Sequence, residues 1–250
     1  AKRRCNRLRG GLIWGMLPTL ALVAAAVLQE LEKLPSAWLD ESLLRCAALG
    51  AGLLLTALAC MPVWKQAVSL LREGRAGCEL CAAVAVLTQL ICCVCGVVTG
   101  STRATPYAAA GALLILACQW GLYLEASALR NAYHLLVLNG TVPYVASVTA
   151  AGVCRQQGTA EGFYRLCSKP DPARRWQNYA LPLVLVTAAV LSGVVCFSGG
   201  NMSDFPWVLT ALTTAGAGLG IPLSGALPMY YLSRRLSRSG CAAAGYAGAK

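Results

Sequence analysis

Two cysteines and a glutamate form the pattern with the clearest chemical potential in this sequence. In the segment GCELC, Cys78 and Cys81 lie three residues apart with Glu79 between them. On a helix the two thiols would share a face, and two thiolates with a carboxylate suit a soft or borderline metal cation. Because one such pair is only half of a usual metal site, the alternative is that both cysteines are ordinary helix residues.

The chain has 13 cysteines in all, and most of the others lie inside apolar runs. There cysteine serves as a small apolar residue, and the pattern of these residues predicts no disulfide framework. The residues in question are Cys46, Cys60, Cys92, Cys93, Cys95, Cys118 and Cys196.

A second candidate site is the segment IPLSGALPMYYLSRRLSRSG, residues 221–240, in which Pro222 and Pro228 interrupt an apolar run. A proline inside a helix removes a backbone hydrogen bond, and hydrocarbon offers no water to replace it. One interpretation is a kink covered by closely approaching helices. The other is a break that shapes an ion path, with Ser224 as its polar side chain. Ile221 and Leu223, which flank Pro222, cannot coordinate a cation, and this favours the kink.

The elements that would position these residues are membrane spans. Hydrophobic residues make up 57% of the chain and charged residues only 12%, which is too apolar for a soluble domain of this length. Apolar runs long enough to cross a bilayer predict an all-α membrane protein with six transmembrane helices. They cover about residues 11–29, 43–64, 80–99, 106–126, 179–198 and 206–232.

A short amphipathic helix is predicted over residues 63–74, directly after Pro62. Its apolar positions recur at helical spacing, and Lys65 and Arg72 are available to lipid headgroups. The apolar positions are Val63, Ala67, Leu70 and Leu71. The chain then divides into an N-terminal hairpin (1–64), the interfacial helix with spans three and four (65–126), an inner loop (127–177) and spans five and six with a basic end (178–250).

The formal net charge of +11 is distributed as expected for a membrane protein, and we expect no nucleic-acid partner. With the N-terminus inside, 18 of the 21 lysines and arginines fall on the cytoplasmic side, leaving only Lys33, Arg45 and Arg103 outside. By the positive-inside rule, this split predicts a multi-pass protein of the cell membrane with both termini cytoplasmic. The lipid bilayer is its first partner, and a soft or borderline metal cation is its candidate ligand.

Several segments, taken in order, resemble the membrane half of heavy-metal-transporting P-type ATPases. The run WKQAVSLLREGRAGCELCAAVAVL is similar to the passage from that family's platform helix into its third span. WGLYLEASALRNA resembles the end of its fourth span, and LSRRLSRSGCAAAGYAGAK resembles the stretch that leads into its phosphorylation domain. The resemblance implies a cation-transport scaffold, with Glu79 at the position of an acidic family residue and Glu125 at that of the family glutamate.

The sequence also departs from that family in ways that bear on catalysis. The prolines lack the Cys-Pro-Cys ligands, the inner loop holds no Thr-Gly-Glu motif, and no Asp-Lys-Thr-Gly motif occurs. ATP hydrolysis would therefore need a domain outside this sequence, and the inner loop is interpreted as a vestigial actuator region. The two functions left open are the membrane part of a degenerate cation pump and a non-enzymatic membrane protein that keeps the scaffold for binding or regulation.

The charge distribution makes the topology testable. In a cysteine-free background, a cysteine placed at Ser36 should react with a membrane-impermeant label applied outside, and one placed at Gln156 should not. Labelling in intact and permeabilised cells measures this. The reverse pattern would overturn the orientation and the family alignment with it.

Overall fold

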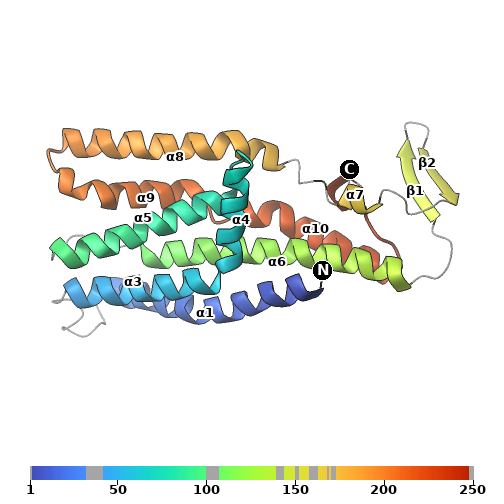
Figure 1. Cartoon of the computed structure of the whole chain (residues 1–250), viewed down its shortest axis with the longest axis horizontal. Helices are drawn as coiled ribbons and strands as arrows, with labels where there is room; N and C mark the ends of the chain where they lie inside the picture. The colour runs from blue at the N-terminus through green and yellow to red at the C-terminus, as the bar shows by residue number, and fades with distance from the viewer. Residues whose placement is uncertain are drawn as a thin grey trace.

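The structure is a computed structural model that describes residues 2–31, 42–99, 107–138, 144–149, 152–157, 163–167, 169 and 173–247. Within these ranges the chain is almost entirely helical, and long helices lie side by side along one axis (Figure 1). The long helices are α1 (Lys2–Glu30), α3 (Ser42–Ala59), α5 (Cys78–Thr99), α6 (Ala108–Leu138), α8 (Ala173–Ser198), α9 (Phe205–Ala217) and α10 (Ile221–Arg238). The predicted outer-side residues Lys33, Ser36 and Arg103 lie outside the described ranges.

The described helices confirm a multi-pass membrane protein in its coarse form. Five segments are long and apolar enough to cross a membrane, or six when the bent pair of α3 and α4 (Met61–Arg72) counts as one span. Leucine, valine and other large apolar side chains remain exposed along α1, α3 and α8. In a protein without a membrane such a surface would be costly, whereas hydrocarbon covers it.

Helices α3 and α4 are joined by a sharp bend, which lies slightly earlier than the sequence predicts. α3 ends at Ala59, and α4 leaves it at 72° (Figure 1). Pro62 lies in the first turn of α4, where its missing N–H costs nothing. Val63, Ala67 and Leu70 are buried as expected, but Leu71 is 62% exposed and does not belong to the buried face.

Helix α6 is the central element of the core, and it extends well past the predicted end at residue 126. It packs along α1 and α10 over most of its length. Beyond residue 126 it stays amphipathic, with Ala128 and Ala132 buried and Arg130 and His134 exposed. These residues fall in the predicted inner loop, 127–177, although their helical period continues.

The rest of the predicted inner loop adds two strands to the all-helical expectation. β1 (Tyr144–Thr149) and β2 (Gly152–Gln157) form an antiparallel hairpin, with Tyr144 opposite Gln157. A short helix, α7 (Phe163–Cys167), follows and packs on the C-terminal 3-10 helix η2 (Gly245–Ala247). The Cys167 thiol lies 4.0 Å from the Ala243 carbonyl oxygen, and its burial raises its pKa.

Polar side chains fasten the helices to one another inside the bundle. Gln119 of α6 donates from Nε2 to the Leu8 carbonyl of α1 (3.1 Å), and Ser233 of α10 donates to the Ala128 carbonyl of α6 (3.1 Å). Gln89 of α5 donates to the Thr214 hydroxyl of α9 (2.8 Å). In an apolar surrounding such bonds set the rotation of each helix about its axis, which apolar packing alone specifies poorly.

The sixth predicted span is interrupted, but at glycines rather than at the prolines. α9 ends at Ala217 with Gly218 at φ +58°, and α10 begins at Ile221. Pro222 falls in the first turn of α10, where proline is tolerated, and Pro228 lies inside α10 without ending it. The proposed cause of the break is therefore corrected: a left-handed glycine ends α9, and Pro222 helps to start α10.

Mutation of the two glycines at this break tests whether the backbone conformation of Gly218 is required there. Gly218→Ala should lower stability by about 1–2 kcal/mol, because a side chain disfavours the left-handed backbone and its Cβ would approach Ile221 Cδ1 to 3.0 Å. Gly220→Ala is the matched control, since Gly220 has φ −78° and open space around its Cβ position. Thermal unfolding in detergent measures both, and an equal loss in the two variants would contradict this account of the break.

Candidate functional site

Three charged side chains from three helices meet inside the bundle. Arg174 of α8 places its Nη2 atom 3.4 Å from Glu79 Oε1 of α5 and 3.3 Å from both carboxylate oxygens of Glu125 of α6. The Glu79 side chain is only 3% exposed, and those of Arg174 and Glu125 are 26% and 29% exposed. We refer to these three residues as the ion cluster.

The turn before α5 and the start of α8 hold Glu79 and Arg174 against each other. Asn178, one helical turn after Arg174, accepts a hydrogen bond from the Ala76 N–H (3.2 Å) and so ties the two chain segments together. Gly77 leaves room for the carboxylate, since a Cβ there would lie 2.6 Å from Glu79 Oε2. The same face of α8 continues to Leu181, whose carbonyl oxygen lies 4.0 Å from the Cys81 thiol.

Glu125 is placed by the face of α6 that receives α10. Gly121, one turn before it, lies against Pro222: a Cβ at Gly121 would approach the Pro222 carbonyl oxygen to 2.6 Å. The first turn of α10 therefore reaches the ion cluster. A cavity of about 20 Å³ remains between these groups, lined by Cys78, Cys118 and Pro222 together with the ion cluster. Its size suits one water molecule or one bare cation.

The charges of the ion cluster do not balance when both carboxylates are ionised. Two glutamates face one guanidinium, which is always protonated, so the group carries one net negative charge. A single arginine nitrogen, Nη2, contacts both carboxylates. An arginine that pairs with one carboxylate usually makes two parallel hydrogen bonds to it instead. Arg174 thus lies between the two carboxylates.

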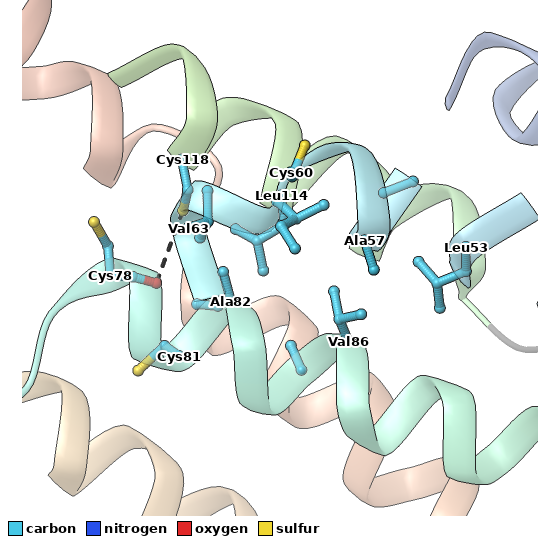
Figure 2. Packing of buried hydrophobic residues seen from close by; sticks show 14 of the residues in the cluster. Leu53, Ala57, Cys60, Val63, Cys78, Cys81, Ala82, Val86, Leu114 and Cys118 are labelled. Carbon is cyan, nitrogen blue, oxygen red and sulfur yellow. Dashed lines mark hydrogen bonds between the residues drawn. The ribbon is translucent and has the colours of Figure 1, made fainter. Parts of the chain in front are cut away.

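The thiols of the predicted metal site point in different directions. The Cys78 thiol lies 3.5 Å from Glu79 Oε2, whereas the Cys81 thiol points toward α8 (Figure 2). The Cys118 thiol donates to the Cys78 carbonyl oxygen at 3.8 Å (Figure 2). In the described part of the chain no three histidine, cysteine or acidic side chains are placed to hold a metal ion. Metal binding by Cys78, Cys81 and Glu79 stays a prediction.

Of the predicted ion-path residues, the structure places Glu125 and Pro222 at the cavity and leaves Ser224 and Pro228 away from it. Glu125 joins Glu79 in the ion cluster, and Pro222 lines the cavity. Ser224 is exposed and donates to the Ile221 carbonyl of its own helix (2.9 Å), and Pro228 is exposed as well. The helix break therefore reaches the cavity through Pro222, and neither Ser224 nor Pro228 lines it.

Arg174 is the site residue that the sequence analysis did not single out. It is one of the 18 lysines and arginines expected on the cytoplasmic side. The structure separates it from its neighbours, because Arg175 and Trp176 are exposed while Arg174 faces α5 and α6. The available signal was helical spacing: Arg174, Asn178 and Leu181 share one face of α8, and that face turns toward the bundle.

Comparison of the chain with protein-family models, with curated proteins and with solved structures finds no match.

Loss of the guanidinium should destabilise the bundle. Arg174→Gln leaves two carboxylates facing each other with no cation between them, and removing one partner of a buried ion pair costs about 3 kcal/mol or more. Arg175→Gln removes the same charge from the neighbouring exposed position and should change the free energy of unfolding by less than about 0.5 kcal/mol. Thermal unfolding in detergent compares the two variants. Equal stability of Arg174→Gln and Arg175→Gln would mean that the ion cluster does not stabilise the bundle.

Proposed function

We propose that this chain is the membrane part of a cation transporter, similar in layout to the membrane half of heavy-metal P-type ATPases. In this proposal cations enter the bundle between Glu79 and Glu125. The observation that carries it is the sharing of one arginine nitrogen by two carboxylates from neighbouring helices, beside a cavity of about 20 Å³.

The donors around the cavity suit a divalent cation of borderline softness. Glu79 and Glu125 supply carboxylate oxygens, and Cys78 and Cys118 supply thiols. Such a mixture accepts Zn²⁺ and similar ions better than Mg²⁺, which prefers oxygen ligands alone. Arg174 competes with the cation for the two carboxylates, because its guanidinium must leave them before a cation can take its place.

The interruption of the sixth span supports the same function. Transport sites near the middle of membrane bundles are commonly built beside discontinuous helices, whose unwound backbone offers carbonyl oxygens. Here Ile221 and Pro222, the first residues after the break, line the cavity of the ion cluster. The break and the carboxylates thus belong to one site.

The alternative function is that of a non-enzymatic scaffold that binds or regulates a partner. It is favoured by the position of Arg174, which already offsets half of the negative charge, and by the exposure of Ser224. In that case the ion cluster serves only to tie α5, α6 and α8 together. The two functions differ in whether a cation can replace the arginine.

Zinc titration of Arg174→Gln tests the proposal. The variant should regain stability on addition of Zn²⁺, because the cation supplies the missing positive charge, and the wild type should need more Zn²⁺ because the guanidinium competes. Arg174→Gln/Glu125→Gln keeps every thiol but only one carboxylate of the pair, and it should not respond. The shift in unfolding temperature with Zn²⁺ is the measurement.

Two results would count against cation binding at this site. One is the absence of any Zn²⁺-dependent stabilisation in Arg174→Gln. The other is an equal shift in Arg174→Gln and Arg174→Gln/Glu125→Gln, which would assign the zinc to cysteines elsewhere. Arg175→Gln, with the ion cluster intact, gives the baseline.

A further inference from the structure

A second and much larger cavity lies between the beginning of α1 and helix α4. Its volume is about 800 Å³. It arises because α4 turns away from α3 by 72° while α1 continues along α3 and α6. The helices approach closely at Gly11, where a Cβ would lie 2.7 Å from the Ala59 carbonyl oxygen, and the space opens toward the N-terminus from there. We call this space the α1–α4 groove.

One part of the α1–α4 groove is strongly basic. Arg3, Arg4 and Arg7 from α1 and Lys65 from α4 line it, and no acidic side chain does. All four cations are exposed. None of them makes an ion pair with a carboxylate among the residues that the structure describes. Four unneutralised cations around one space attract an anion more strongly than scattered surface charges do.

The other part of the groove is apolar. Leu8, Trp14, Met61 and Leu122 line it, and the Trp14 side chain is 71% exposed. Trp14 lies in the apolar run of α1, and tryptophan is typical of the level where hydrocarbon meets headgroups. The groove therefore combines a cationic end with an apolar wall at the end of the membrane-spanning bundle that carries the N-terminus (Figure 1).

We propose that the α1–α4 groove binds an anionic phospholipid. The phosphate lies among Arg3, Arg4, Arg7 and Lys65, and an acyl chain follows Trp14 and Met61. A soluble phosphate compound would contact the basic side chains but leave the apolar wall without a partner. A zwitterionic lipid would pack on the apolar wall but place its own cation among the arginines. Basic pockets between spans are a known form of anionic lipid site.

Binding of fluorescent phosphatidylglycerol to the purified chain in detergent micelles tests the proposal. Unlabelled phosphatidylglycerol should displace the probe, while phosphatidylcholine and glycerol 3-phosphate at the same concentrations should not. Arg7→Gln/Lys65→Gln removes one cation from each wall and should weaken binding at least tenfold, since each cation near an anionic surface contributes roughly fivefold.

Arg235→Gln/Arg238→Gln is the matched control, because it removes the same charge from exposed positions on α10. It should keep binding within about twofold, and unfolding temperatures should show that both variants are folded. Equal weakening in the two pairs would overturn the proposal in favour of diffuse attraction to the basic surface. Displacement by glycerol 3-phosphate would overturn it in favour of a soluble anion, and unchanged binding in Arg7→Gln/Lys65→Gln would remove the site altogether.

Discussion

The contact of Arg174 with two glutamates is the interaction on which the arrangement of this bundle depends most. Apolar surfaces can slide and rotate against one another at little cost in hydrocarbon, whereas a buried carboxylate has to meet a cation. Glu79, Glu125 and Arg174 come from α5, α6 and α8, so one set of ionic contacts fixes three helices at once. The Asn178 contact with the Ala76 N–H then fixes the start of α8 relative to the turn before α5.

The same requirement applies to the backbone where spans are interrupted. At the α3–α4 bend the indole N–H of Trp64 donates to the Ala57 carbonyl (3.2 Å), which supplies that oxygen with a donor at the end of α3. At the α9–α10 break the Gly220 carbonyl accepts from the Leu223 and Ser224 N–H groups (3.1 and 3.0 Å). These two carbonyl oxygens at the interruptions thus accept hydrogen bonds from groups nearby in the chain, in a surrounding where water is scarce.

The sequence was sufficient for the membrane class and for the approximate position of the apolar helices, because length and hydrophobicity alone decide both. It was insufficient where a helix continues beyond the length that crosses the bilayer, as α6 does after residue 126. It also placed the break of the sixth span at prolines, although a proline in a first helical turn promotes the helix and α9 ends at Gly218.

The ion cluster could be anticipated only in part, for a reason of geometry. Glu79 and Glu125 were singled out separately, one beside the cysteines and one by resemblance, and their meeting depends on the packing of α5 against α6. The sequence did not distinguish the inward-facing Arg174 from its exposed neighbours Arg175 and Trp176, because composition does not show which face of α8 turns inward. Pairing between distant segments is set by three-dimensional contacts that no local pattern contains.

The two proposed sites are close enough to influence each other. Leu122 of α6 lines both the α1–α4 groove and the cavity of the ion cluster, and a further cavity of about 320 Å³ is lined by Arg4 and Gln66 as well as by Glu125 and Arg174. Unneutralised arginines on this side repel any cation that approaches Glu125. An anionic headgroup bound among them would remove that repulsion, and the low dielectric of the surrounding helices would make the effect larger than at an open surface. Anionic lipid in the groove and a cation at the carboxylates should therefore favour each other, and by thermodynamic linkage the effect must be the same in both directions.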